Sequence, residues 1–397
     1  MLDPAQMGRP KHDSLQWFGG CGTVAITAEE FFETQHAPSQ VKSAIVVGYF
    51  GSWSRIMIKR ARKATIGYVD LFAGRGRFED GSESTPMLIS RKAASDAALR
   101  SALRIFFNDK SSNEISALQR EIENIPGIEQ LTHAPRFNNE GVSPRLIQRL
   151  AEFRGIPTFL FADPFGYMGI SLELIHLLLG NKKSEALIFF NTNRINAGIG
   201  NEFVRNHIDA LFGTSRAETV RAKVALLHGE DRERAILDSF QEGLNAIGFR
   251  YVLRFRFRFR TAERTSHHLV HCSRHPLAEK IMKEIMDTYS AKTFEGVPRF
   301  EVPPTDYGQQ SLFDEPAAPL TLEQELLHRF AGKTLTLPEI MQQHGPGTPY
   351  VERNYRAALW HLIDEGRVQS DPPAVQMPLR KGKRTWPRGA KVLFPAQ

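Results

Sequence analysis

The sequence predicts an α/β fold: a sheet of parallel strands plus a terminal antiparallel hairpin, followed by a small separate domain at the carboxyl end. Three observations predict it. Short apolar runs alternate with longer stretches of helical periodicity, as in a parallel sheet covered by helices on both faces. Within Tyr251–Arg260, the residues from Leu253 onward then alternate strictly between apolar and basic. Finally, five prolines within 294–319 separate this region from a basic carboxyl-terminal region.

The composition is that of a globular chain. With 397 residues, 41% of them hydrophobic and 24% charged, the chain is long enough for two or three domains with a core. No apolar run approaches the ~18 residues of a membrane span, and no signal peptide is evident. The two cysteines, Cys21 and Cys272, exclude a disulfide framework and a cysteine-based zinc site. We therefore expect a cytoplasmic protein without membrane attachment, and we predict no metal site.

Four regions are expected in chain order: an N-terminal helical extension (1–63), a sheet domain (64–293), a Pro-rich linker (294–319) and a basic domain (320–397). Helical spacing places a helix over Ser39–Lys63. The strands expected next are the apolar runs Ile66–Phe72, Leu103–Phe107, His133–Phe137, Thr158–Ala162 and Ala186–Phe190. The helices expected between and after them are Pro86–Leu99, Asn113–Glu123, Ser143–Phe153, Ser171–Leu179, 202–212 and 216–244.

An antiparallel pair should close the sheet domain. Tyr251–Arg260 places phenylalanines on one face and arginines on the other, and Ser266–Cys272 is its expected partner, followed by a helix over Pro276–Tyr289. We interpret the arginine face as solvated, which discourages edge pairing; a phosphate-binding stripe is the alternative. In the last region, three helices and two strands around the basic loop Arg380–Arg384 predict a winged-helix order.

The sharpest local signal is D-L-F-A-G-R-G at Asp70–Gly76, where the first strand ends. Parallel sheets bind nucleotide-like ligands at this edge, and the spacing is the one that Rossmann-like methyltransferases use for S-adenosylmethionine. On this interpretation Asp70 faces the ligand's ammonium group, and Phe72, Gly74 and Gly76 shape the methionine pocket. The alternative is a glycine turn required only for packing. NAD is disfavoured because the G-x-G-x-x-G spacing is absent.

Two further strand ends extend the candidate cofactor site. Asp109 follows the second strand, where a carboxylate accepts hydrogen bonds from ribose hydroxyls. Its alternative role is that of an N-cap for the helix that follows. Asn138 and Asn139, at the end of the third strand, are placed to reach an adenine.

The fourth strand ends F-A-D-P-F-G-Y, which supplies candidate catalytic residues Asp163, Pro164 and Phe165. Amino-methyltransferases that act on bases carry an acid or amide, two prolines and an aromatic ring at this point. A carboxylate oxygen and the next carbonyl accept the amine hydrogens, while the ring stacks on a flipped base. The second proline is missing here, so a simple strand-to-helix turn remains the alternative.

Candidate nucleic-acid contacts lie in the C-terminal domain. Asn354, Tyr355 and Arg356 fall on the third helix, which reads a major groove in winged-helix proteins, and Lys381, Lys383 and Arg384 fall on the wing. A protein-interaction module is the alternative. In the linker, Gln309–Phe313 resembles the short peptide that partners of the bacterial replication sliding clamp insert into its pocket.

The order of these segments resembles the three-Cys-motif partner family of prokaryotes and mobile elements. The matching segments are Tyr68–Gly76, Gly81–Pro86, Phe107–Asp109, Phe161–Gly166, His275–Met282 and Asn354–Leu359. The resemblance covers most of residues 40–365 and implies a Rossmann-like, methyltransferase-like fold. It also implies a partner protein, because the genes of this family often lie beside one for a radical-SAM-like protein with three cysteines.

The leading hypothesis is a methyltransferase-like enzyme that binds S-adenosylmethionine and acts on nucleic acid, with DNA as the expected substrate. Its first rival is a non-catalytic nucleic-acid-binding protein that recruits the radical-SAM-like partner. The second is a nuclease or base-processing enzyme, which requires the aspartates at 70, 109 and 163 to converge around a metal.

Overall fold

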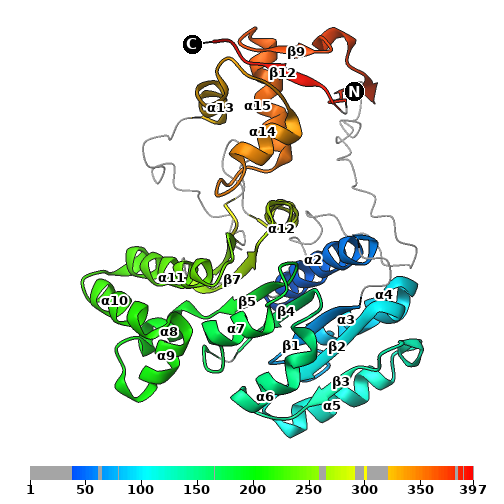
Figure 1. The fold of residues 1–397 in the computed structure, drawn as a ribbon, viewed down its shortest axis with the longest axis vertical. Coiled ribbons are helices and arrows are strands. Elements are labelled where there is room, and N and C mark those ends of the chain that lie inside the picture. Colours follow the sequence, from blue (N-terminus) through cyan, green and yellow to red (C-terminus); the bar gives the residue numbers. More distant parts are fainter. Residues whose placement is uncertain are drawn as a thin grey trace, which may run out of the picture.

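The computed structural model describes residues 38–60, 65–78, 80–164, 166–258, 265–290, 299–301, 321–380, 383–387 and 389–396. Within these residues a helix-covered sheet forms the larger part of the molecule, and a small helical domain stands beside it, with α12 (Pro276–Thr288) at the junction (Figure 1). The predicted α/β fold with a C-terminal winged-helix domain is confirmed.

The central sheet has seven strands in the order β3-β2-β1-β4-β5-β7-β6. They are β1 (Ile66–Asp70), β2 (Leu103–Asn108), β3 (Arg136–Asn138), β4 (Thr158–Ala162), β5 (Glu185–Phe190), β6 (Tyr251–Arg258) and β7 (Thr265–Ser273). The first five strands are parallel, and β7 runs antiparallel between β5 and β6. This is the strand order of a Rossmann-like methyltransferase sheet, and it reverses between β1 and β4, where such sheets bind ligands.

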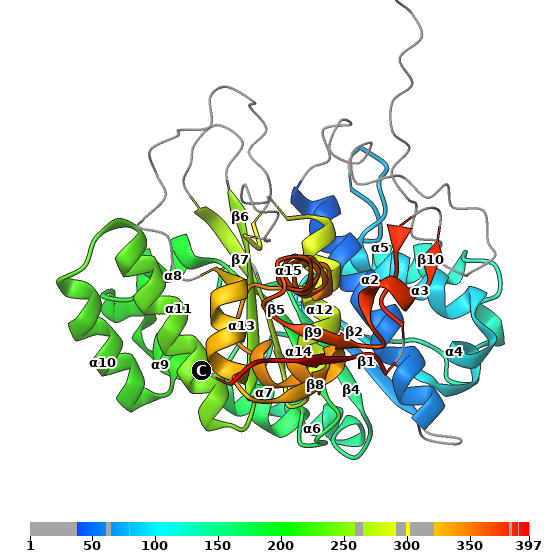
Figure 2. The same ribbon diagram turned by 90° about the horizontal axis from the view of Figure 1, so that it is seen from above.

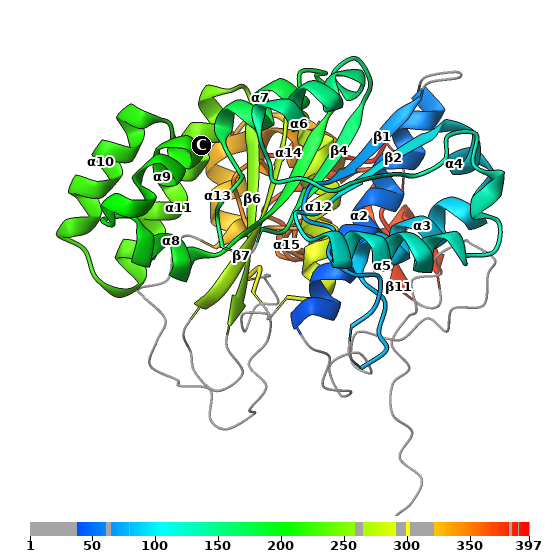
Figure 3. The same cartoon turned by 90° about the horizontal axis from the view of Figure 1, so that it is seen from below.

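Helices cover both faces of the sheet, as the continuous burial of β1 and β4 requires. One face carries α2 (Pro38–Arg60), α3 (Thr85–Ser95), α4 (Ala97–Ala102), α5 (Ser112–Glu123) and α12. The other carries α6 (Pro144–Arg149), α7 (Leu172–Leu178), α8 (Thr192–Gly198), α9 (Arg205–Phe212), α10 (Thr214–Ala225) and α11 (Gly229–Ala246). Short 3-10 turns are η1 (Ile128–Gln130), η2 (Leu150–Phe153), η3 (Glu202–Val204) and η4 (Ala374–Gln376). Seen from above and below, α8–α11 gather at one end of the sheet domain and α3–α5 at the other (Figures 2 and 3).

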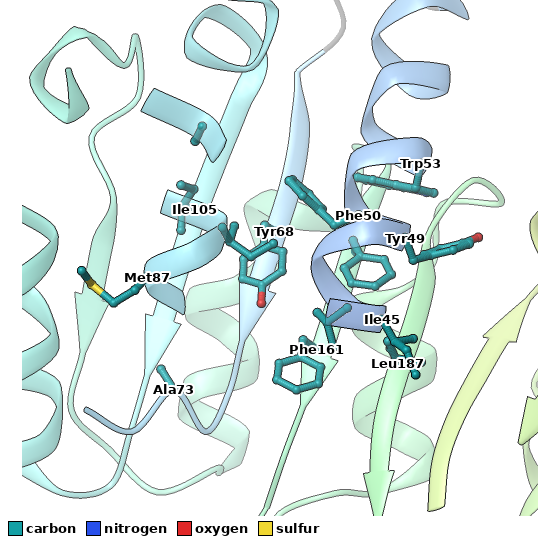
Figure 4. Close-up of a cluster of buried hydrophobic side chains, with 14 of the residues drawn as sticks. Ile45, Tyr49, Phe50, Trp53, Tyr68, Ala73, Met87, Ile105, Phe161 and Leu187 are labelled. Carbon is teal, nitrogen blue, oxygen red and sulfur yellow. The ribbon is translucent and has the colours of Figure 1, made fainter. Parts of the chain in front are cut away.

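An aromatic core fixes α2 on the sheet. Tyr49, Phe50 and Trp53 of this helix are at most 2% exposed and point toward β1 and its neighbouring strands (Figure 4). The ring of Phe50 packs edge-on against Tyr68 of β1, with 5.3 Å between the centroids. Burial of these large rings stabilises the fold by on the order of 2 kcal/mol per side chain. The middle of α2 is therefore held in place over the sheet.

Three sequence-based expectations differ from the structure in detail. The helix expected over 86–99 is two helices, because Asp96 breaks the first and caps α4 by accepting from the N–H groups of Ala98 and Leu99. The helix expected over 216–244 is likewise divided into α10 and α11. Strand β8 (Thr334–Thr336) was not expected at all, since three half-exposed residues carry little periodic signal.

The arginines of β6 are expected to face solvent on an edge strand. Strand β6 does end the sheet, but Arg254 and Arg256 are only 23% and 20% exposed, so this pair is largely covered rather than solvated. Phe255 and Phe257 are fully buried, as predicted. The opposite face is covered by α11, however, and Arg254 donates to Asp238 of that helix at 2.8 Å. Arg256 likewise donates to Glu230 at 2.8 Å. Acidic side chains on α11 therefore pair with Arg254 and Arg256, which the strand's own sequence does not reveal.

The C-terminal domain has the winged-helix arrangement. It contains α13 (Leu322–Phe330), β8, α14 (Leu337–His344), α15 (Glu352–Asp364), β9 (Gln369–Asp371), the pair β10 (Leu379–Arg380) and β11 (Lys383–Arg384), and β12 (Lys391–Leu393). Strand β12 lies between β8 and β9 in a three-stranded sheet. Capping boxes begin α13 at Thr321 and α14 at Thr336. None of the described helices is both long enough and apolar enough to cross a membrane.

Polar contacts join α12 to the turn between α14 and α15. The Lys283 ammonium donates to the Gly345 carbonyl at 2.7 Å, and Glu279 accepts from the Gly347 N–H at 3.1 Å. Farther along α12, Asp287 accepts from Arg353 at 2.8 Å. A cavity of about 280 Å³ lies at this junction between α12 and α14. The first turn of α15 therefore faces the sheet domain.

Candidate active site

Three aspartates lie at one edge of the sheet because their strands are parallel and in register. Asp70 is paired with Phe107 of β2 and with Phe161 of β4. Asp109 and Asp163 each come two residues after these partners. Asp70 is the last residue of β1, and the other two directly follow β2 and β4, so all three lie at the carboxyl ends of adjacent strands. The charges of Asp163 and Asp109 both act on the pKa of Asp70. The register therefore brings the three residues to the same edge of the sheet.

Asp70 lies at the centre of this edge and is 1% exposed. One carboxyl oxygen, Oδ1, accepts from the Phe72 N–H at 3.1 Å. The other, Oδ2, is buried and has no hydrogen-bond partner within the described part of the chain. Burial, followed by the charges of Asp163 and Asp109, raises the pKa of Asp70 to about 8 against the lowering effects of the Phe72 N–H and Lys42. At neutral pH the group is largely a neutral acid that can donate as well as accept.

The two glycines of the turn that follows β1 have different surroundings: Gly74 borders open space, and Gly76 packs closely against α5. Gly74 has φ +60, and a Cβ built there would meet no atom within 4 Å. A Cβ on Gly76 would lie 2.9 Å from the Cβ of Glu121 on α5. Gly74 thus borders open space at the strand edge, whereas Gly76 allows the turn to pack against α5. Phe72, between them and β1, is half-buried and approaches Gly169.

Asp109 ties the second strand end to the glycine turn. Its Oδ2 accepts from the Gly74 N–H and its Oδ1 from the Ser111 N–H, both at 2.9 Å. The cap of α5 is Ser111 rather than Asp109, the alternative that the sequence left open. Asn139 is exposed and donates to the Asp109 carbonyl at 2.9 Å, so it sits beside the same turn.

Asp163 is joined to a residue that motif reasoning missed. Its carboxylate forms an ion pair with Lys42 of α2, and the two side chains are 25% and 13% exposed. The Lys42 ammonium also lies 4.7 Å from the centroid of the Phe189 ring of β5. Pro164 is buried, and Phe165 lies outside the described residues. The available signal was a lysine among the apolar positions of a helix that packs on the sheet.

An aromatic wall borders Lys42. The His267 ring of β7 lies 3.9 Å from the Phe189 centroid and 4.6 Å from that of Phe257. Its Nε2 is buried and unpartnered among the described side chains, while its Nδ1 contacts the Ser266 hydroxyl at 2.8 Å. Burial, with the charge of Lys42 second, lowers the pKa of His267 to about 3, so the ring is neutral. No group of three or more metal-ligating side chains occurs in the ranges that the structure describes.

The residues present fit the amino-acid and nucleoside ends of S-adenosylmethionine. The orphaned Oδ2 of Asp70 is a buried polar atom in need of a partner, such as an ammonium group. The empty space beside Gly74 admits a ligand close to the backbone. Phe72, Asp109 and Asn139 border the same turn.

The three residues of α15 predicted to contact nucleic acid all have partners within the winged-helix domain. Tyr355 is fully buried and its hydroxyl contacts His344 Nδ1 at 2.9 Å, so it is a core residue of the winged-helix domain. Asn354 accepts from the Val351 N–H at 3.0 Å, which caps the start of α15. Arg356 is engaged by Glu352 on the same helix at 2.6 Å.

On the wing, Arg384 forms two hydrogen bonds to Asp364, at 2.8 and 2.6 Å, and lies over the Trp360 ring. Lys383 is in β11 beside it. Lys381 and the clamp-like segment 309–313 lie outside the described residues.

One family model and several solved structures are similar to parts of the chain. Residues 301–374 match the model of the GMT-like wHTH domain family. An S-adenosylmethionine-dependent methyltransferase from Agrobacterium tumefaciens is 13% identical, with a TM-score of 0.31 over 58% of this chain and 62% of that chain. The chain thus spans less than two thirds of that relative.

Two further solved structures are similar to the chain. A Legionella pneumophila protein, LPL1258, is 10% identical, with a TM-score of 0.36 over 64% of this chain and 94% of its own. A dimethyladenosine transferase from Plasmodium falciparum is 11% identical, with a TM-score of 0.25 over 83% of this chain and 97% of its own. No curated protein matches the chain. The fold assignment rests on the strand order itself.

Proposed function

We propose that the chain binds S-adenosylmethionine at the carboxyl edge of β1, β2 and β4 and transfers a methyl group to nucleic acid held by the winged-helix domain. The observation that carries the proposal is the buried, unpartnered Oδ2 of Asp70 beside the open side of Gly74. Most buried polar atoms in folded proteins have a hydrogen-bond partner, so an unpartnered carboxyl oxygen beside open space at this edge supports a ligand there. Its place, where the strand order reverses, is where sheets of this topology bind ligands.

The chain's own residues have distinct roles in this proposal. Asp70 binds the amino group of the ligand, and Phe72 and Gly74 border the rest of its amino-acid end. Asp109, which positions the glycine turn through Gly74, and Asn139 lie toward the nucleoside end. When bound, the cofactor supplies an electrophilic methyl group.

At the acceptor side, Asp163 and the backbone beyond it accept hydrogens from the target amine, and Phe165 stacks on the flipped base. Pro164 fixes the direction of the chain at this point. The ion pair with Lys42 has to be opened for Asp163 to take this role, because the ammonium occupies the carboxylate.

The substrate side of the proposal rests on the winged-helix domain and on the basic charge of the chain, +7. DNA is the proposed nucleic acid. Lys381, Lys383 and Arg384 on the wing are the proposed phosphate contacts. A radical-SAM-like three-Cys-motif protein is the proposed partner, and Gln309–Phe313 is a proposed contact to the replication sliding clamp.

Calorimetry tests the cofactor proposal. We expect S-adenosylhomocysteine to bind the wild-type chain and to lose most of its affinity in Gly74→Val, which puts a side chain into the open space. Gly332→Val is the matched control, since Gly332 has φ +71 and equally open surroundings in the winged-helix domain. Absence of heat with the wild type, or equal losses in both variants, would contradict the proposal.

A second function is favoured by one observation. The carboxylate of Asp163 is already paired with Lys42, as it would be in a protein that holds nucleic acid without methylating it. A non-catalytic partner of the radical-SAM-like protein predicts co-purification with that protein and full cellular function of Asp163→Ala. The enzymatic proposal predicts loss of function in Asp163→Ala.

A further inference from the structure

Lys42 reaches the candidate active site from an element that carries no motif. It lies in the second turn of α2, between Val41 and Ile45, which are 2% and 0% exposed. The next residue, Ser43, is hydrogen bonded through its hydroxyl to Thr85 at the start of α3, with 2.9 Å between the oxygens. The backbone at Lys42 is thus fixed relative to the segment that follows the glycine turn.

The ammonium group of Lys42 acts on several groups of the site. It pairs with Asp163, lies against the face of Phe189, and lowers the pKa of Asp70 through its charge. It also lowers the pKa of His267. A single flexible side chain is therefore within electrostatic reach of the strand ends of β1 and β4 and of the aromatic wall on β5 and β7.

The proposed ligand carries a negative charge, its carboxylate, which the aspartates cannot bind. Its amino-acid end carries an ammonium and a carboxylate. The carboxyl of Asp70 suits the ammonium, but a second anion beside the strand-end aspartates is repelled unless a cation compensates it. The structure places the Lys42 cation there, paired with Asp163, and its four-carbon stem lets the ammonium change partners without movement of the helix.

We propose that Lys42 binds the carboxylate of the amino-acid end of S-adenosylmethionine, and that it leaves Asp163 in doing so. This inference rests on the proposed function. Lys42 then couples the two halves of the site. When the cofactor site is empty, Lys42 neutralises Asp163. When the cofactor is bound, Asp163 is free to accept hydrogens from the target amine. Cofactor then binds before nucleic acid.

Two nucleosides that differ only in the amino-acid end isolate the contact. S-adenosylhomocysteine carries the carboxylate, whereas methylthioadenosine lacks the whole amino-acid end. By calorimetry we expect Lys42→Met to weaken S-adenosylhomocysteine about tenfold or more, the size of a charge-assisted hydrogen bond. Binding of methylthioadenosine stays within about twofold of wild type. Lys42→Arg should retain most of the affinity, which separates loss of charge from loss of folding.

Two further variants complete the experiment. Asp163→Asn removes the competing carboxylate and should strengthen S-adenosylhomocysteine several-fold without changing methylthioadenosine. Lys280→Met, which removes an ion-paired lysine at the domain junction, should change neither. Equal affinities of wild type and Lys42→Met for S-adenosylhomocysteine, or equal losses for both nucleosides, would overturn the role of Lys42. If the wild type binds neither nucleoside, the proposed function itself fails, and this inference with it.

Discussion

At the scale of single residues, the protonation of Asp70 is the feature with the clearest consequence. Its pKa of about 8 lies far above the usual value because the group is buried. The folded protein holds this proton more tightly than the unfolded chain does. The proton therefore contributes its full stabilisation below about pH 4, and this contribution is lost as the pH rises toward 8. Asp70→Asn has no charge to bury, so its stability relative to wild type should rise across this range, by on the order of 5 kcal/mol at most.

Urea unfolding of the two proteins at pH 5, 7 and 8.5, followed by circular dichroism, measures this difference. A difference in unfolding free energy that is the same at all three pH values would mean that Asp70 is ionised throughout. A bound ligand gives a second test of this pKa. Its ammonium group beside Oδ2 should lower the pKa of Asp70.

The two glycines of the turn allow a second residue-scale prediction. Gly76→Ala forces a methyl group to 2.9 Å from Glu121, so we expect a loss of about 1–3 kcal/mol in unfolding free energy from overpacking. Binding of S-adenosylhomocysteine to the folded variant should remain near wild type, in contrast to Gly74→Val. Calorimetry at a temperature well below the transition separates the two effects. A binding loss as large as that of Gly74→Val would place Gly76 in the ligand pocket instead.

At the scale of elements, the sequence predicts what its local periodicity encodes. The buried runs of β4 and β5 were found almost to the residue, because parallel strands covered on both faces read as continuous apolar segments. The strand-end aspartates follow from them. What could not be predicted comes from other elements: Lys42 reaches Asp163 across 121 positions, and the burial of Tyr355 depends on how α14 packs on α15.

The contact of α12 with the winged-helix domain gives an element-scale prediction. Lys283 and Glu279 form a pair at 3.0 Å in which both side chains are at most 6% exposed. Lys283→Met leaves a buried carboxylate without its cation and should destabilise the chain by about 3–5 kcal/mol. Lys280→Met removes a partly exposed pair with Glu352 and should cost about 0–1 kcal/mol. Urea unfolding of both variants measures the contrast, and similar losses would show that the buried pair does not hold this interface.

At the scale of the whole molecule, the docking of α15 limits how nucleic acid can approach. The Glu352 N–H donates to Glu284 of α12 at 3.0 Å, and Arg353 is paired with Asp287, so the first turn of α15 is in contact with the sheet domain. The wing, by contrast, carries Arg384 on an exposed hairpin. Phosphate contacts by the wing are therefore compatible with the docked arrangement.

Salt dependence tests the wing as a phosphate-binding surface. We expect the affinity for duplex DNA to fall with salt, and the slope of log affinity against log salt to drop by about one unit in Lys383→Ala. Tyr355→Phe alters only a buried hydroxyl and should leave the slope unchanged while lowering stability by about 1 kcal/mol. Fluorescence anisotropy at several salt concentrations provides both slopes. An unchanged slope in Lys383→Ala would remove the wing from the interface.

The central claim is that the carboxyl edge of β1 and β4 is a site for S-adenosylmethionine. A crystal structure of the chain, from crystals grown with S-adenosylhomocysteine, tests this claim most directly. The account predicts ligand density beside Gly74, with the amino group at Asp70 Oδ2. Density only in the cavity between α12 and α14, or none in crystals soaked to saturation, would contradict it.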